Sequence, residues 1–499
     1  MDKRYKKRFL DLEYAKELYY YDIYPKVVPV GKETAITLEP LGRSFAFVPE
    51  ETYTVRVCPM GEGMPNEYPF RRNRFAYSVK PDTDGCLRVP FLFFAEQEYY
   101  FRIYTSLTPW NHCHSGEPDW PKRLPAEQER MLFELPVYAV EADLQGLYPF
   151  KGDTHLHSSD SHGSEPPELV AAYNRKSGLD FVVISEHYRY YPSLDAMDAF
   201  RDCPTEMCIV LGEEVHSPKG PDGNSNDLHY VAFGNLWSID ALFGCNNAEM
   251  NHWRGVPGTE GRAVCAGETP PEPMPPISTP DEHIAYMTEY AKQFNLPEGV
   301  DRYPYAESVW IADMIHKAGG AAVFAHPYWI QDVLQVPPPL TQHILETAGF
   351  DALEVFGGAE YYEQNGFQLS QYYQDKGNGL TYAPVGGSDQ HRSVGPDMHR
   401  IATILFAEAN TRAALVEAIR NGKSIAVDYL NPDPLYCGDF RLVRYALFLE
   451  KNYFTLHDEL CFEEGRAMVD FALGKPGAKE ILQLLCGRVQ KQREKYFAV

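Results

Sequence analysis

Two histidines separated by one residue, His155 and His157, are the first residues of this chain whose types and spacing could do chemistry. In a β-strand, side chains two residues apart point to the same face. The two imidazoles can therefore project together from a strand end and bind one metal ion, and imidazole suits zinc, iron and manganese. An HxH pair also occurs by chance in long chains, so the pair alone does not distinguish a metal site from two surface histidines.

Further histidines and carboxylates follow this pair, and each lies at or near the end of an apolar run. They are Glu186 and His187, Glu213 and Glu214, His229, His326, and Asp389 and His391. In barrels of alternating strands and helices, catalytic groups gather at the carboxyl ends of the strands. Scattered core histidines have no reason to recur at that one structural position, so the pattern predicts a single shared metal site.

The runs that must position these residues are continuously apolar, which is typical of parallel strands buried on both faces. They cover residues 149–154, 180–185, 208–212, 228–234, 321–326, 352–356 and 382–387. Helical segments lie between some of them, over 167–177 and 305–318, and Gly319 is placed to end the second helix. Alternating strands and helices over this length predict an α/β barrel or a doubly wound sheet.

In these motifs and in their order the chain resembles the PHP family, the polymerase and histidinol phosphatase group of metal-dependent phosphoesterases. Glu214 rather than Glu213 is the carboxylate that aligns with the family. The resemblance covers about 149–428 and implies a distorted (β/α)7 barrel as the catalytic domain. The matching motifs are Asp153-Thr-His-Leu-His-Ser-Ser, Ser185-Glu-His, Gly212-Glu-Glu, His229, Ala325-His-Pro and Asp389-Gln-His.

Two positions depart from the family pattern. The loop after the first motif often holds an aspartate, whereas this chain has His162, and histidine is an accepted ligand there in some branches. Glu186 replaces the usual aspartate before His187. Neither departure removes a ligand, so the resemblance implies an intact site. Glu213 and His216 lie beside these motifs without a family position, and we expect them to be polar neighbours of the ligands.

The resemblance implies a site for two to three divalent metal ions, with zinc, manganese or iron as candidates. A metal-activated hydroxide would attack phosphorus in line, while the ions neutralise the charge of the phosphoryl group. Glu214 would bridge the first two ions. The implied ligands are His155, His157, Glu214 and Asp389 for the first ion, Glu214, His229 and His326 for the second, and His162, His187 and His391 for the third.

Five residues are the candidates for catalytic roles. Glu214, Asp389 and His326 are also implied metal ligands. Arg189 and Arg392 directly follow two of the motifs, and their planar guanidinium groups could contact phosphate oxygens. The sequence leaves open whether these two arginines are instead surface charges on loops.

The regions on either side of the barrel carry no recognisable chemistry. Residues 1–148 contain short strands separated by Gly, Pro and Asn, which predicts an immunoglobulin-like β-sandwich. A second HxH pair in this region, His112 and His114, has no ligands following it and is interpreted as a polar loop. Residues 429–499 have helical periodicity and are expected to form a mostly helical extension.

The segment at about 235–304 is too long for a simple connection and predicts an insertion that borders the site, with a disordered loop as the alternative. Within it, Thr279 is a candidate N-cap, followed by Pro280 at the first helical position. Asp281 and Glu282 would lie in the first turn, where acidic residues favour the helix dipole. We therefore expect a helix that begins after Thr279.

Charge and composition limit the kinds of partner. The 499 residues carry a net charge of −24, which disfavours long nucleic acid. No apolar run reaches the length of a membrane span, the basic N-terminus lacks the apolar core of a signal peptide, and the ten cysteines form no CxxC pair. We expect a cytoplasmic protein with a small phosphorylated substrate and no membrane partner; the oligomeric state stays open.

Four functions are consistent with this pattern. The first is hydrolysis of a small phosphomonoester such as a nucleotide or sugar phosphate, and the second is phosphodiesterase or exonuclease activity on short oligonucleotides. The third is amidohydrolase-like C–N hydrolysis, which also begins with HxH but usually bridges its metals with a lysine rather than with a residue such as Glu214. The fourth is a non-catalytic metal-containing binding protein, which nine ligands disfavour because structural zinc usually needs four.

Overall fold

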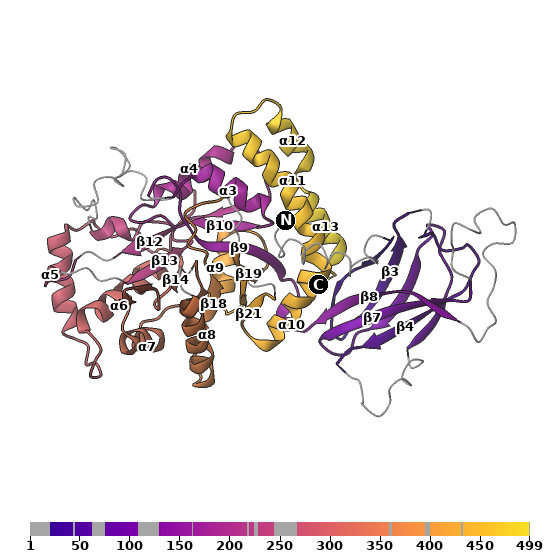
Figure 1. The fold of residues 1–499 in the computed structure, drawn as a ribbon, viewed down its shortest axis with the longest axis horizontal. Coiled ribbons are helices and arrows are strands. Elements are labelled where there is room, and N and C mark those ends of the chain that lie inside the picture. Colours follow the sequence, from indigo (N-terminus) through magenta and orange to yellow (C-terminus); the bar gives the residue numbers. More distant parts are fainter. Residues whose placement is uncertain are drawn as a thin grey trace. The chain divides into compact units, whose positions relative to one another are not determined.

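The computed structural model shows a mixed α/β protein with several sheets and a helical C-terminus (Figure 1). It describes residues 20–42, 45–61, 75–107, 129–161, 163–216, 219–223, 228–243, 267–358, 362–394, 400–430 and 433–498. The chain divides into two compact units: residues up to Leu147 with Leu447–Thr455 and Gln490–Val499, and Tyr148–Ala446 with Leu456–Val489. The domain boundaries expected at about 148 and 428 stay predictions. His112, His114 and His162 lie outside the described residues.

The strands of the first unit form two sheets that pack around one core. Alternate residues of β6 (Leu87–Leu92) and β7 (Gln97–Thr105) are buried, so each sheet has one apolar face. Leu38 and Phe91 from one sheet pack in the same core as Val55 and Phe101 from the other. The predicted immunoglobulin-like topology stays a prediction. The strand orders are β1 (Tyr21–Tyr24), β3 (Glu33–Pro40), β6, and β2 (Val27–Pro29), β8 (Arg130–Val140), β7, β4 (Tyr53–Pro59), β5 (Ala76–Val79).

Two further sheets, of six and five strands, form the centre of the second unit. Each of the seven predicted runs contributes a strand, and the pairs of β9 with β10, β10 with β11, β14 with β17 and β17 with β18 are parallel as expected. Isolated bridges at Leu156–Gln390 and His187–Glu214 link the two sheets near their strand ends. The closed seven-stranded barrel stays a prediction. The orders are β11 (Cys208–Val210), β10 (Phe181–Ile184), β9 (Tyr148–Leu156), β19 (Ile401–Ala407), β20 (Ser424–Asp428), β21 (Leu435–Cys437), and β12 (Gly212–His216), β13 (His229–Phe233), β14 (Ala321–Phe324), β17 (Ala352–Phe356), β18 (Ala383–Gly386).

The expectation that the run at 228–234 is parallel to its neighbours is wrong. β13 is antiparallel to both β12 and β14, and His229 pairs with His216. A strand buried on both faces is continuously apolar whichever way it runs, so the apolar pattern did not report its direction. The reversal decides the position of His229, because the first residue of β13 lies beside the carboxyl end of β12.

The helices predicted within the second unit are present. α3 (Pro167–Lys176) and α6 (Arg302–Lys317) match the two expected segments, and Gly319 follows α6 with φ of 81°. α5 (Pro280–Ala291) begins after Thr279, whose side chain accepts from the backbone N–H of Glu282 while the Glu282 carboxylate accepts in return from the backbone N–H of Thr279. The others are α4 (Tyr191–Phe200), α7 (Pro338–Thr347), α8 (Tyr362–Gly377) and α9 (Arg412–Arg420).

The mostly helical extension expected from residue 429 is confirmed. It contains α10 (Phe440–Leu449), the π-helical turn Glu450–Phe454, α11 (Thr455–Ala472), α12 (Ala478–Leu485) and α13 (Arg488–Tyr496), and β21 is the one strand among its described residues. Within the described part of the chain, none of the helices is long and apolar enough to cross a membrane.

Candidate metal centre

The structure brings together, within the second unit, every predicted metal ligand that it describes. His162 lies outside the described residues, so its position in the site stays a prediction. The other eight come from strands far apart in the sequence. His155 lies in β9 and His157 follows it, His187 follows β10, Glu214 lies in β12, His229 begins β13, His326 follows β14, and Asp389 and His391 follow β18.

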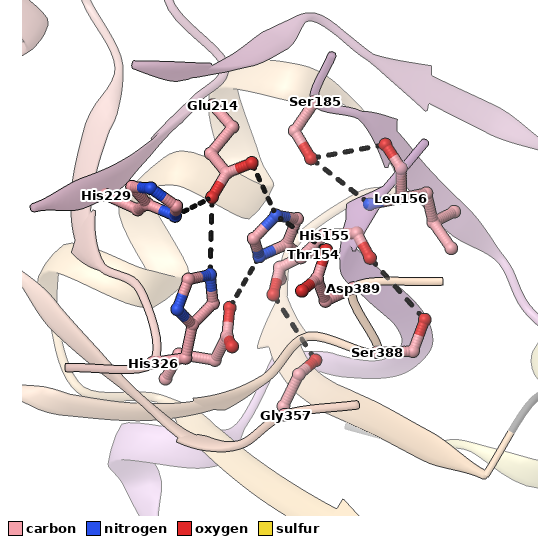
Figure 2. Close-up of polar contacts among 12 residues, drawn as sticks. Thr154, His155, Leu156, Ser185, Glu214, His229, His326, Gly357, Ser388 and Asp389 are labelled. Atoms are coloured by element: carbon pink, nitrogen blue, oxygen red, sulfur yellow. Dashed lines mark hydrogen bonds and ion pairs between the residues drawn. The ribbon is translucent and has the colours of Figure 1, made fainter. Parts of the chain in front are cut away.

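Glu214 lies in the middle of this cluster, and both of its carboxylate oxygens face imidazoles (Figure 2). Oε1 is 2.9 Å from Nδ1 of His229 and 3.2 Å from Nε2 of His326. Oε2 is 2.7 Å from Nδ1 of His187 and 3.4 Å from Nε2 of His155. A carboxylate with different partners on its two oxygens has the arrangement of a bridging ligand.

The four residues predicted for the first ion form one compact set. One ligand atom from each of His155, His157, Glu214 and Asp389 lies within 4.8 Å of the other three. Nε2 of His157 is 2.9 Å from Oδ1 of Asp389 and 3.5 Å from Oε2 of Glu214. The two Nε2 atoms of the HxH pair are 3.2 Å apart. Strand alternation therefore does place both rings on one side, facing two carboxylates.

A second set of histidines lies next to the first. His157, His187 and His391 also offer ligand atoms within 4.8 Å of one another. The rings of His157 and His187 are stacked, with centroids 4.3 Å apart, and the ring of His391 is 4.5 Å from that of His157. Two of the three implied ligands of a third ion are thus adjacent to the first-ion set.

The donor set fits divalent metal ions. Oε2 of Glu214, Nδ1 of His229 and Oδ1 of Asp389 are buried and have no hydrogen-bond partner of acceptable geometry among the described residues. Buried polar atoms are normally satisfied, so such atoms at one place indicate a missing positive partner. Imidazole and carboxylate together are the ligands of zinc, manganese and non-haem iron.

Electrostatics in this cluster favour added positive charge. Burial by itself would raise the pKa of Asp389, but the facing His155 and His157 hold it well below its usual range. Glu214 behaves in the same way, with His187 and His229 as the main opposing charges. Burial lowers the pKa of His157, yet Asp389 and Glu186 overcome this and raise it from 6.5 to about 9. Without metal, the carboxylates therefore favour a proton on His157.

Three residues in or beside the site have left-handed backbone conformations although none is glycine. Their φ angles are 59° for Tyr188, 25° for His326 and 49° for Asp389. Such conformations cost about 1–3 kcal/mol each and persist only where the surrounding structure enforces them. At His326 and Asp389 the strain occurs at predicted ligands, which agrees with a site that positions these side chains for function.

Glu354 is a site residue that the sequence analysis missed. Its Oε2 is 2.8 Å from Nδ1 of His155, so it can hold that ring with Nε2 toward Glu214 and Asp389. Gly387 allows this packing, because a Cβ there would lie 2.6 Å from Cβ of His155 and 2.7 Å from Oε2 of Glu354. The available signal was a single glutamate within the otherwise apolar run of 352–356.

The remaining carboxylates have supporting positions. Glu186 accepts hydrogen bonds from the backbone N–H of Ser158 and from the hydroxyl of Ser161, and it thereby fixes the loop that follows the HxH pair. Glu213 points to the opposite face of β12, where the side chain of Asn235 donates to it at 2.9 Å and that of Ser238 at 2.7 Å. Glu213 is therefore not part of the metal centre.

The two predicted phosphate-binding arginines differ in burial. Arg189 is only 8% exposed, and one guanidinium nitrogen, Nη2, has no hydrogen-bond partner among the described residues. Burial and the charge of Glu186 raise the pKa of Asp160, in the loop after the HxH pair, and Arg189 lies close enough to that carboxyl to oppose them. Arg392 is exposed.

Searches of family models and of curated proteins find no match for this chain. Among solved structures it is similar to a two-domain protein from Bacteroides vulgatus that contains a predicted PHP-like metal-dependent phosphoesterase. The identity is 18%, the alignment covers 61% of this chain and 71% of that chain, and the TM-score is 0.37.

Two further solved structures are similar over about half of this chain. One is a proposed metal-dependent phosphoesterase from Bifidobacterium adolescentis, with 20% identity, 49% of this chain and 89% of that chain covered, and a TM-score of 0.31. The other is an amidohydrolase from Chromobacterium violaceum with bound sulfate and no metal, with 17% identity, coverages of 48% and 87%, and a TM-score of 0.28. At these TM-scores the similarity carries no argument about chemistry. The chemistry of the site is therefore argued from the residues described above.

Proposed function

We propose that this protein is a metal-dependent hydrolase that cleaves a phosphoester, and that its substrate is a small phosphomonoester such as a nucleotide or sugar phosphate. The observation that carries the proposal is the position of Glu214, whose two oxygens face separate groups of histidines beside Asp389. This arrangement suits the binding of two or more divalent ions side by side, and paired ions suit reactions at phosphorus.

The proposed ligand sets are those that the family resemblance implies, and the distances support the first two of them. His155, His157, Asp389 and Oε2 of Glu214 would hold one ion, and His229, His326 and Oε1 of Glu214 would hold another. His187 and His391 would hold a third ion together with His162. Zinc, manganese or iron ions bound there would activate water and neutralise charge on a phosphoryl group.

The protein's own residues would orient the substrate and the ligands. Glu354 holds the ring of His155, and the side chain of Gln335 lies 3.2 Å from Nδ1 of His326, so both rings present Nε2 to the cluster. Arg189 would donate from its buried Nη2 to a phosphate oxygen, with the planar geometry that favours phosphate over a carbonyl group. Exposed Arg392 would contact the substrate less specifically.

The proposal is tested by reconstitution and a substrate screen. The purified chain is stripped of metal, reloaded with zinc, manganese or iron, and assayed with an aryl phosphate, nucleotides, sugar phosphates, short oligonucleotides and N-acyl amides. We expect turnover of phosphomonoesters, and we expect it to fall at least about a hundredfold in Asp389→Asn. Loss of a metal ligand should reduce activity at least as much as loss of a residue that orients a ligand. His343→Ala, a change in α7 away from the cluster, is the control.

Two results would contradict the proposal. Turnover in Asp389→Asn equal to that of the wild type would place the reaction elsewhere. Hydrolysis of amides or of oligonucleotides, without hydrolysis of phosphomonoesters, would assign the same centre to a different reaction.

A further inference from the structure

The β12–β13 hairpin carries one side chain of a metal-binding type that is not among the nine predicted ligands. This side chain is His216. Glu214 and His216 are two residues apart in β12 and therefore point to the same face. His216 pairs directly with His229 across the antiparallel ladder, and the centroids of their rings are 3.9 Å apart. Strand geometry thus places His216 beside two predicted ligands.

The ring of His216 is directed into the cluster. Its Nε2 is 2.7 Å from Nδ1 of His187 and 3.4 Å from Oε2 of Glu214, and the same oxygen is 2.7 Å from His187. The side chain of His216 is 13% exposed, against 10% for His187 and 1% for Glu214. Three ligand atoms from three residues therefore surround one small space that is mostly shielded from solvent.

We infer that His216 is a further metal ligand, and that it binds the ion assigned above to His187, with Glu214 as the neighbouring donor. This inference rests on the proposed metal centre and extends it beyond the nine residues implied by the family resemblance. Ligands around a tetrahedral ion lie about 3.3 Å from one another when the bonds are about 2.0 Å long. One of the three distances has this length, and the other two require outward shifts of about 0.6 Å, which small ring rotations supply.

The competing explanation is that His216 only donates a hydrogen bond that orients His187. The two explanations differ in what a replacement side chain must do. An aspartate at 216 can bind a metal ion through oxygen but has neither the shape nor the ring N–H of histidine. A glutamine can hydrogen-bond but binds these ions poorly.

The experiment measures metal binding, so it does not depend on a known substrate. The full chain and its His216→Ala, His216→Gln and His216→Asp variants are loaded with zinc or manganese, desalted and analysed for metal per chain, and affinities are measured by calorimetric titration. His343→Ala is the matched control, and circular dichroism and thermal melting establish that each variant is folded.

We expect His216→Ala and His216→Gln to lose one ion per chain, or to bind one ion at least tenfold more weakly, and His216→Asp to regain most of the loss. Unchanged stoichiometry and affinity in folded His216→Gln would overturn the inference. Weakened binding in His216→Asp alongside this result would show that His216 acts only through its hydrogen bond. A wild-type protein that binds no divalent ion would overturn it together with the proposed function. A wild-type protein that binds ions but hydrolyses no phosphoester would remove the proposed function alone.

Discussion

Oε2 of Glu354 lies 2.8 Å from Nδ1 of His155, on the side of the ring that faces away from Glu214 and Asp389. The two residues come from β17 and β9, which belong to different sheets. Both side chains are fully buried. A carboxylate in this position selects the tautomer that leaves Nε2 free to bind a metal ion, and it increases the basicity of that nitrogen.

Replacing Glu354 by glutamine should weaken metal binding without unfolding the protein. The amide keeps the size of the side chain but removes the negative charge, so the affinity should fall about 10- to 100-fold. Competition with a chelator of known affinity measures the change. Glu346→Gln, on the exposed side of α7, should leave the affinity unchanged. An unaltered affinity in Glu354→Gln would mean that Glu354 has only a packing role.

Replacing Glu214 by glutamine should reduce metal binding more than Glu354→Gln does, because Glu214 is a proposed ligand of two neighbouring ions. We expect the loss of more than one ion per chain and a fall in turnover of at least about a hundredfold. Elemental analysis of the desalted protein measures the loss. Glu213→Gln is an informative comparison. Glu213 is the residue before Glu214, but its side chain points to the other face of β12 and contacts Asn235 and Ser238. Equal metal content in the two variants would contradict the central position assigned to Glu214.

Metal binding should become tighter as the pH rises toward about 9. The carboxylates of Asp389 and Glu186 raise the pKa of His157 from 6.5 to about 9, against the effect of burial. Below that pH the metal-free protein carries a proton on His157 that a metal ion must displace, so the affinity should change by up to about tenfold per pH unit for this one proton. Calorimetric titration in buffers of different ionisation enthalpy measures the released protons. A pH-independent affinity would contradict the prediction.

The same shift has a consequence for stability. Because the folded-state pKa of His157 is raised, its protonated form stabilises the metal-free protein fully below pH 6.5, and this contribution disappears as the pH rises to about 9. Thermal melting of the chelator-treated protein between pH 6.5 and 9 should show a falling Tm. His157→Gln, which has no titrating ring, should show a smaller fall over the same range.

A buried ion-pair network should contribute to stability independently of the metal centre. Arg175 is fully buried and donates to Oε2 of Glu464 at 2.7 Å and to Oδ1 of Asp180 at 3.0 Å. Glu464→Gln leaves the buried guanidinium with one carboxylate instead of two, so it should reduce the free energy of unfolding by up to about 3–5 kcal/mol. Denaturant unfolding of the protein measures the difference.

Glu463→Gln is the matched control for this substitution. Glu463 is the preceding residue of α11, and it pairs at the surface with Arg488. Exposed pairs contribute about 0–1 kcal/mol because water screens them. Similar losses in the two variants would show that burial of the Arg175 network adds nothing to stability.

Local pattern was sufficient for seven strands and three helices of the second unit. Apolar runs and helix signals are properties of neighbouring residues, so these seven strands, α3 and α6 could be predicted, and the capping residues of α5 could be read from Thr279 to Glu282. The placement of histidines and carboxylates at the ends of these runs was likewise visible, since the end of a run is a local feature.

Other features depended on which strands become neighbours. The direction of β13 could not be read from its apolar residues, because burial on both faces leaves the same pattern in either direction. The role of Glu354 depends on β17 lying within reach of β9, and that of His216 on a hairpin that brings it opposite His229. The sequence by itself determined the ligand types and the strand ends that carry them. Only the tertiary structure decided which side chains meet, because contacts between distant strands are not encoded in any one segment.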